Sequence, residues 1–183
     1  MANLVLAVGG LPGAGKNEVV DYIMTKPNWS KVYLGEVTFD ILRERGLPFT
    51  QENERPVREE VRKKHGMAAY AILSLDKIKK QHEISNVVLE SMYSWEEYLF
   101  FREQFGDNFK MLAVYASPKT RIARLANRPE RPLTAKETEE RDFSQIENLH
   151  QAGPIARADF TVMNERTLED LHQAIDQVLQ QLS

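Results

Sequence analysis

The stretch "GLPGAGKN" occupies residues 10–17 and directly follows a short apolar run, "LVLAV" at residues 4–8. It matches the phosphate-binding-loop pattern G-x-x-x-x-G-K-[ST] at every position but the last. Glycines let such a loop curl so that successive N–H groups point at one anion, and the following helix presents its positive end to the same anion. Lys16 then reaches the β- and γ-phosphates as a point charge. The stretch therefore predicts a nucleoside-triphosphate site built from a strand, a loop and a helix.

The loop departs from the pattern at Asn17, which stands where a Ser or Thr hydroxyl normally touches magnesium. An amide carbonyl can coordinate Mg²⁺ or hold one of its waters, and Mg²⁺ takes most of its binding from the phosphates. We therefore expect a weakened Mg²⁺ site with Asn17 and Glu90 as its protein ligands. The predicted triphosphate-binding residues of this segment are Gly10, Leu11, Pro12, Gly13, Ala14, Gly15, Lys16, Asn17 and Glu18.

Strand-like and helix-like segments alternate along the chain. Strand candidates lie at residues 4–8, 31–35, 86–90, 111–116 and 159–164. Helical patterns fill the intervals, and the longest pattern, from residue 36 to about 81, is interrupted near Gly46 and Gly66. This alternation predicts βαβ units and a three-layer α/β/α fold with about five parallel strands. Ligands of such sheets bind at the carboxyl ends of the strands, so the predicted loop and the turns after the next two strands should face one cleft.

The composition excludes several classes of protein. A chain of 183 residues is the size of one domain, and a net charge of −3 gives no support to a nucleic-acid-binding surface. The absence of cysteine excludes disulfides and thiolate metal sites, and the four histidines are isolated from one another. The chain begins without the features of a signal peptide, and no apolar run reaches transmembrane length. We expect a cytoplasmic monomer or homodimer without nucleic-acid or membrane partners.

A basic segment at residues 117–133 predicts a lid. It contains a single acid, Glu130, and five basic residues: Lys119, Arg121, Arg124, Arg128 and Arg131. The first three of its arginines are three and four residues apart, which places them on one helix face. Phosphoryl transfer needs positive charge around the migrating group, and arginines on a closing lid supply it while they exclude water. We predict that Arg128 and Arg131 are catalytic, that Arg124 binds the triphosphate and that Arg141 contacts the acceptor.

The motifs together resemble a known group. "GEVTFDILRERG", "SWEEYLFFREQFGDNF", "ASPKTR" and "RADFTVMN" make the chain similar to the adenylate-kinase-like, dephospho-CoA-kinase-like P-loop proteins of archaea, from about residue 4 to residue 182. The resemblance implies a nucleoside-monophosphate-kinase fold with ATP or another nucleoside triphosphate as donor, Mg²⁺ and a small-molecule acceptor. It implies one domain over residues 1–183, with a core (1–35, 83–127 and 151–183), a helical acceptor-binding insertion (about 36–82) and an arginine-bearing lid (about 128–150).

The resemblance is partial where the acceptor is expected. The acids that follow the second and third strands of the family appear here as Glu36 and Glu90, but the two arginines that hold the acceptor's phosphate are replaced by Phe39 and Tyr93. A lost arginine leaves a phosphate without a bidentate partner. Arginines elsewhere could substitute, namely Arg43, Arg45, Arg55, Arg58 and Arg62. Alternatively, Phe39 and Tyr93 line a pocket for an aromatic or apolar acceptor, or they belong to the core.

Two functions remain open at this point. The first is an ATP-dependent kinase of a nucleotide-like small molecule, such as a (deoxy)nucleoside monophosphate or dephospho-CoA. In this hypothesis Lys16, Glu36 and Glu90 are catalytic, since one acid can hold the waters of Mg²⁺ while the other accepts a proton from an attacking hydroxyl. The predicted acceptor-binding residues are Phe39, Arg43, Tyr93 and Arg141. The alternative is a nucleotide-binding regulator or slow NTPase, which Asn17, Phe39 and Tyr93 favour.

Overall fold

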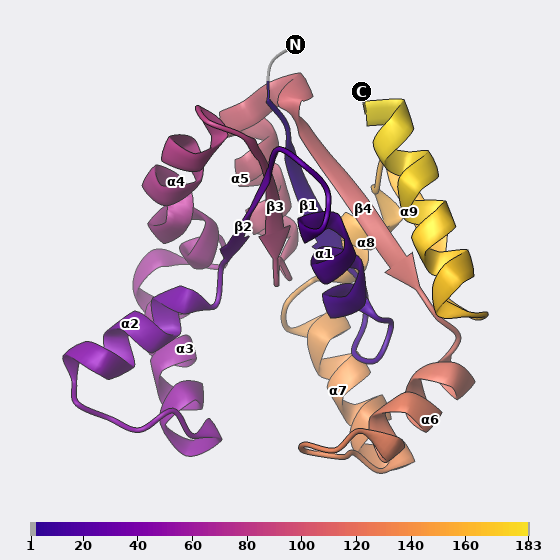
Figure 1. Ribbon diagram of the computed structural model, residues 1–183. Coiled ribbons are helices and arrows are strands. Elements are labelled where there is room, and N and C mark those ends of the chain that lie inside the picture. Colours follow the sequence, from indigo (N-terminus) through magenta and orange to yellow (C-terminus); the bar gives the residue numbers. More distant parts are fainter. Residues whose placement is uncertain (1–2, 183) are drawn as a thin grey trace.

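The strand order places the phosphate-loop strand at the centre of the sheet. The computed structural model describes residues 3–182, and in them one fully parallel sheet has the order β2-β3-β1-β4-β5 (Figure 1). The strands are β1 (Val5–Gly9), β2 (Trp29–Tyr33), β3 (Asn86–Glu90), β4 (Phe109–Tyr115) and β5 (Phe160–Met163). Parallel strands need crossover connections, which the helices provide. The predicted α/β fold with five parallel strands is confirmed.

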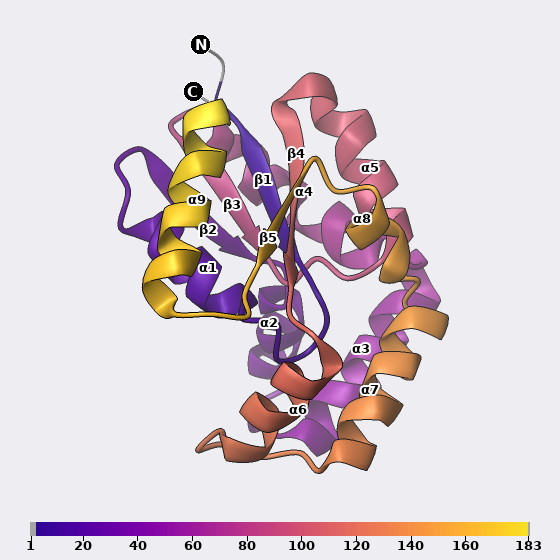
Figure 2. The same cartoon turned by 90° about the vertical axis from the view of Figure 1, so that its right-hand side faces the viewer.

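Helices cover both faces of the sheet and extend beyond its carboxyl edge. Figure 2 shows α1 and α9 on one side of the sheet and α5 and α8 on the other. At the carboxyl ends of the strands, α2 and α3 lie on one side of the phosphate loop and α6 and α7 on the other (Figure 1). The helices are α1 (Lys16–Met24), α2 (Glu36–Glu44), α3 (Gln51–His65), α4 (Ala69–His82), α5 (Trp95–Phe105), α6 (Pro118–Asn127), α7 (Ala135–Glu147), α8 (Ala152–Ala156) and α9 (Leu168–Leu182), with a short 3₁₀ turn at Gly106–Asn108.

The central strand β1 is covered on both faces, which gives the fold its three layers. Its side chains alternate between two hydrophobic cores: Val5 and Ala7 pack with residues of α4 and α5, and Leu6 and Val8 pack with residues of α1 and α9. All four are buried. A strand buried on both faces is apolar throughout, because period-2 alternation sends successive side chains into different cores. The uninterrupted apolar run in the sequence therefore predicted the place of this strand correctly.

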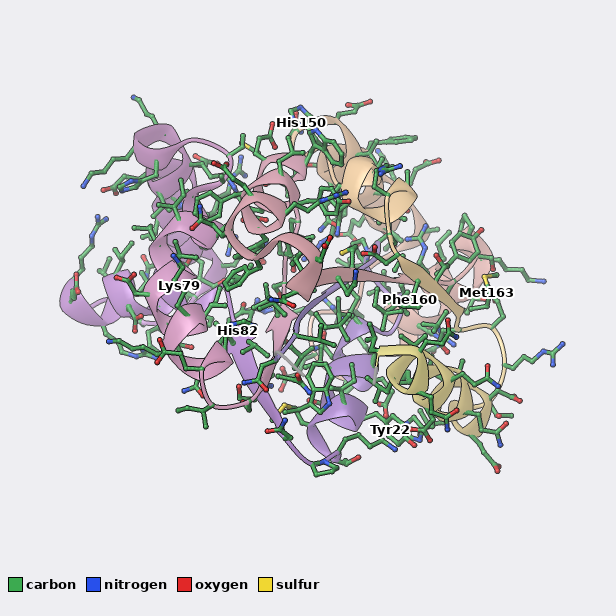
Figure 3. All side chains as sticks on the ribbon, turned by 90° about the horizontal axis from the view of Figure 1, so that it is seen from above. Tyr22, Lys79, His82, His150, Phe160 and Met163 are labelled. Carbon is green, nitrogen blue, oxygen red and sulfur yellow. The ribbon has the colours of Figure 1, made fainter. Side chains whose placement is uncertain are left out.

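The amino-terminal end of the sheet is fixed by polar contacts far from the phosphate loop. Figure 3 looks down on this end and shows Tyr22 beside α9 and His82 on the other side of the sheet. The Tyr22 hydroxyl donates to Asp176 over 2.8 Å, and the Tyr22 ring stacks on His172 with centroids 3.7 Å apart. The His82 ring lies 2.6 Å from the carbonyl of Asn3. Two histidines that suggested no role in the sequence thus connect secondary-structure elements.

The predicted element boundaries differ from the structure by one or two residues. The predicted strand at residues 31–35 is β2 at Trp29–Tyr33, because Gly35 already has helical backbone angles as the N-cap of α2. The long helical pattern divides as expected at Gly46 and Gly66, whose φ values of 64° and 78° end α2 and α3. The five-residue helix α8 was not predicted, since its length is too short for a periodic pattern.

The start of α5 is held by a buried capping box that also positions Tyr93. The Ser94 hydroxyl accepts from the N–H of Glu97 at 3.0 Å and donates to the carbonyl of Met67 at 2.9 Å. In return, Glu97 Oε2 accepts from the N–H groups of Tyr93 and Ser94 at 2.8 and 2.9 Å. Burial raises the pKa of Glu97. The chain that leaves β3 is therefore fixed by reciprocal hydrogen bonds.

We expect Ser94→Ala to lower the free energy of unfolding by about 1–2 kcal/mol, because it removes an N-cap acceptor and leaves the Met67 carbonyl without its partner. Urea denaturation followed by circular dichroism measures this loss. Thr134→Ala is the matched control, since Thr134 and Glu137 form the same capping box at the exposed start of α7. A Ser94→Ala effect no larger than that of Thr134→Ala would contradict the importance assigned to the buried cap.

Candidate functional site

The phosphate loop joins β1 to α1 in a conformation that only glycine tolerates. Gly10, Gly13 and Gly15 have φ values of 149°, 79° and 99°. A Cβ at Gly10 would collide with the carbonyl oxygen of Val114, and one at Gly15 with the side-chain amide of Asn164. The end of β4 and the residue after β5 therefore lie so close to the loop that no side chain fits at these two glycines. Such a cradle fits a phosphate chain held by inward N–H groups.

Lys16 turns back into the loop. Its Nζ donates to the carbonyl oxygens of Gly10 and Leu11 at 2.7 and 3.2 Å. Burial and, to a smaller extent, the positive charges of Arg141 and Arg121 lower the pKa of this amine to about 8. An ammonium group in such surroundings lacks a compensating anion, and the β- and γ-phosphates of a triphosphate would supply one.

Three side chains from distant parts of the chain hold the loop in shape. Gln151 donates to the carbonyl of Gly10 at 3.1 Å, Arg121 to that of Pro12 at 3.1 Å, and Asn164 to that of Ala14 at 2.9 Å. No sequence pattern predicted a role for Gln151 or Asn164. Asn164 directly follows β5, so its position at the carboxyl edge of the sheet could have singled it out, whereas Gln151 follows no recognisable pattern.

The predicted common face of three lid arginines is wrong. Arg121 is buried, and its guanidinium donates to both carboxylate oxygens of Asp142 on α7, at 2.8 and 2.6 Å. Arg128 follows the last residue of α6 and has an extended backbone. Arg124 donates from Nη2 to Asn164 at 3.1 Å, and its buried Nη1 has no hydrogen-bond partner within the described residues. Arg124 is thus connected to the loop through Asn164, which itself donates to Ala14, and its role in triphosphate binding stays a prediction.

A cavity of about 480 Å³ lies between the α2–α3 segment and the lid. Five of the predicted site residues line it: Phe39, Tyr93, Arg128, Arg131 and Arg141. Arg141 also connects the cavity to the phosphate loop, because its charge acts on Lys16. The structure therefore brings the predicted lid arginines and the aromatic replacements together around one space. Their chemical roles stay predictions.

The remaining predicted residues do not line the cavity. Arg43 is half exposed on α2, where it donates to Glu36 at 2.5 Å and also pairs with Asp40. Glu90 pairs with Lys31 at 3.3 Å, and only 17% of its side chain is exposed. Each of the two predicted acids thus has a basic partner in this structure. Asn17 is exposed at the first turn of α1, and Glu18 beside it lies 3.4 Å from the ring of His172.

Two other arginines enter the cavity from α3. Arg58 and Arg62 line it, whereas Arg45 and Arg55 form ion pairs on the exposed surface with Glu60 and Glu59. The tyrosines that line the same space are Tyr33, Tyr70 and Tyr93. Burial, followed by the nearby Tyr93 and Glu90, raises the pKa of Tyr33 to about 12, so its phenol stays protonated at neutral pH. The cavity thus combines aromatic walls, phenol hydroxyls and guanidinium groups.

The described residues suit a magnesium ion that is bound mainly through phosphates. Within residues 3–182, no three His, Asp or Glu side chains gather as a metal site of their own. Mg²⁺ commonly uses one or two protein ligands together with substrate phosphates and waters. The exposed amide of Asn17, next to Lys16, is such a ligand in chemical type.

A parallel sheet of this order, with a glycine loop after its central strand, defines the P-loop class with a kinase-like fold. The chain belongs to the AAA_18 family, described as an AAA domain, whose model matches residues 6–147, and to the UPF0200 proteins. UPF0200 protein MJ1399 of Methanocaldococcus jannaschii is 32% identical over 184 residues, which cover 98% of this chain and 90% of the relative. UPF0200 protein PF1294 of Pyrococcus furiosus is 32% identical over 183 residues, 96% of each chain.

Solved structures share the fold at low sequence identity. TT1252 from Thermus thermophilus superposes with a TM-score of 0.69 at 19% identity over all of both chains. Shikimate kinase from Bacteroides thetaiotaomicron superposes with a TM-score of 0.62 at 13% identity over 98% of each chain. These similarities show a common architecture. Among the helices of residues 3–182, none combines the length and the apolar character needed to cross a membrane.

The pKa of Lys16 predicts that triphosphate binding depends on pH. Below about pH 8, Lys16 of the protein without triphosphate is protonated and can pair directly with an anion. Above it, binding must first add a proton, so affinity should fall as the pH rises and binding should take up protons from the buffer. Titration calorimetry of Mg-ATP in buffers of different ionisation enthalpy measures both effects.

Lys16→Ala should abolish binding and proton uptake, while the exposed Lys119→Ala should leave both unchanged. Unaltered affinity in Lys16→Ala would refute the loop assignment.

Proposed function

We propose that this protein is an ATP-dependent phosphotransferase acting on a nucleotide-like small molecule. One observation carries the proposal: the cavity between the α2–α3 segment and the lid receives arginines from both of these walls. Convergent guanidinium groups suit a reaction in which negative charge is transferred between two anionic substrates. A (deoxy)nucleoside monophosphate or dephospho-CoA is the acceptor class that fits such a cavity. The kinase fold of a structural neighbour, a shikimate kinase, supports the proposal by analogy.

In this proposal the loop and the lid act on opposite sides of the transferred phosphoryl group. The N–H groups of the glycine loop and Lys16 hold the β- and γ-phosphates of the donor. Arg128, Arg131 and Arg141 surround the migrating group and exclude water from it. The charge of Arg141 on the lid acts on Lys16 in the phosphate loop, so the loop and the lid contribute positive charge to the same region.

Magnesium, held by the amide of Asn17 and through water by Glu90, would supply neutralisation of phosphate charge. Glu36 and Glu90 both form ion pairs, which must be broken before either carboxylate can accept a proton. Glu90 would have to leave Lys31, and Glu36 would have to leave Arg43, before either accepts a proton from an acceptor hydroxyl. An acceptor that approaches these strand ends can exchange such contacts, since both pairs are partly exposed.

A nucleotide-binding regulator or slow NTPase is the second candidate. It is favoured by Asn17, which lacks the metal-binding hydroxyl, and by the ion pairs that occupy both predicted acids. A regulator would bind triphosphate without an acceptor-dependent reaction. The two candidates therefore differ in one measurable property, the dependence of ADP formation on an acceptor.

The decisive experiment measures ADP formed from Mg-ATP with and without nucleoside monophosphates, deoxynucleotides and dephospho-CoA. We expect ADP only when one of these acceptors is present, together with a new phosphorylated species in the phosphorus NMR spectrum. Lys16→Ala is the control and should form neither. Tight binding of ATP with no acceptor-dependent turnover across the whole panel would contradict the kinase and support the regulator.

A further inference from the structure

Helix α3 directs two arginines into the cavity from the same face. Arg58 and Arg62 are one helical turn apart, so their side chains are neighbours. The guanidinium of Arg62 lies 5.1 Å above the ring of Tyr70, and its buried Nε has no hydrogen-bond partner within the described residues. A buried N–H without an acceptor is costly, and one on a charged group more so. The Nε of Arg62 therefore offers a hydrogen bond to an anion, because Glu97, the nearby acid of the cavity wall, uses its Oε2 in the cap of α5.

Glu54, also on α3, lies between these arginines and the lid. Its Oε2 accepts from Arg58 Nη1 at 2.9 Å, and its Oε1 is 4.0 Å from Nη2 of Arg131. Only 12% of the Glu54 side chain is exposed, although carboxylates usually remain in water. A carboxylate of the protein thus occupies the space where positively charged groups from both walls converge.

An ordinary helix-stabilising ion pair does not account for this arrangement. Arg55 and Glu59 on the same helix form such a pair, and their side chains are 76% and 67% exposed. Glu54 and Arg58 are much less exposed, at 12% and 35%, and Glu54 additionally faces an arginine of another segment. Pairs on a helix surface need neither burial nor a third charge.

We infer that Arg58 and Arg62 hold the phosphate monoester of the acceptor, and that Glu54 occupies this phosphate position until the acceptor displaces it. The inference rests on the proposed function and narrows its acceptor to a nucleoside monophosphate. The guanidinium groups of Arg58 and Arg131 flank one carboxylate, and Arg62 offers an N–H without a partner in the described residues one turn further along the same face of α3. A phosphate monoester carries a nearly double negative charge, which suits these groups better than a single carboxylate does. Arginines on α3 thereby replace those absent at positions 39 and 93.

Displacement of Glu54 also connects the acceptor to the lid. While Glu54 pairs with Arg58, the same carboxylate lies beside Arg131, so α3 and the lid share one anion. A phosphate with three oxygens can accept from both α3 arginines and from Arg131 at once. Acceptor binding would then replace the weak contact between Glu54 and Arg131 by a phosphate that both α3 and the lid bind more strongly.

The test measures acceptor binding while the donor site is blocked. With the donor site saturated by Mg²⁺ and a non-hydrolysable ATP analogue, AMP, CMP, GMP and UMP are titrated by calorimetry, each against its nucleoside and against dephospho-CoA. We expect at least one monophosphate to bind clearly more tightly than its nucleoside. Arg58→Gln and Arg62→Gln should each weaken its binding roughly 10- to 100-fold, the range expected for a lost charged hydrogen bond. Arg55→Gln, on the exposed face of the same helix, should have no such effect.

Glu54→Gln provides a test in the opposite direction, because removing the competing carboxylate should tighten monophosphate binding several-fold. Glu52→Gln, which removes an exposed acid from the same helix, is its control. An unchanged affinity for the ATP analogue shows that each variant is folded. Equal binding of monophosphate and nucleoside, no binding of any monophosphate, or weaker binding in Glu54→Gln would overturn the inference. Acceptor-dependent ADP formation that is insensitive to Arg58→Gln and Arg62→Gln would overturn it as well, while leaving the proposed phosphotransferase intact.

Discussion

The buried guanidinium of Arg121 holds together the parts on which the site depends. It donates to the carbonyls of Ala116 and Pro12 and to both oxygens of Asp142, so that the end of β4, the phosphate loop and α7 meet at one group. Removing one partner of such a buried pair typically costs about 3–5 kcal/mol, because the other charge is left without compensation. Hydrogen bonds of this kind fix direction as well as distance. The hydrogen bonds of Arg121 therefore tie the phosphate loop to α7.

This arrangement concentrates positive charge before any anion arrives. Burial, followed by the positive charges of Arg141 and Arg121, lowers the pKa of Lys16, and the cavity receives further arginines from α3 and the lid. Like charges held in fixed positions are unfavourable in the free protein, and a phosphate relieves that repulsion when it binds. Glu54 and Asp142 reduce the repulsion in different ways. Asp142 is part of the framework, bound through two hydrogen bonds, whereas Glu54 is bound through one and can be exchanged.

The sequence predicted those features that depend on neighbouring residues. The glycine loop and the apolar strands are local patterns, and the structure shows each of them at or within two residues of its expected place. Contacts between residues far apart in the sequence were not predictable in this way. Gln151 reaches Gly10 across 141 positions, and no periodicity in the sequence encodes that approach. The rotation of a helix about its own axis was equally hidden, so the sequence did not show that Arg58 lines the cavity while Arg43 pairs with Glu36 and Asp40 outside it.

Phe39 belongs to both the core and the cavity, whereas Tyr93 is half-buried and lines the cavity. Phe39 packs against Tyr33 and Phe49, with ring centroids 6.0 and 5.1 Å apart, and also lines the cavity. An arginine at this position could not make these ring contacts without placing its charge against the core. Arg58 and Arg62 supply positive charge from α3 instead, so Phe39 keeps its ring contacts on α2. The two departures from the kinase pattern are therefore consistent with a relocated phosphate contact, and they do not by themselves indicate a lost one.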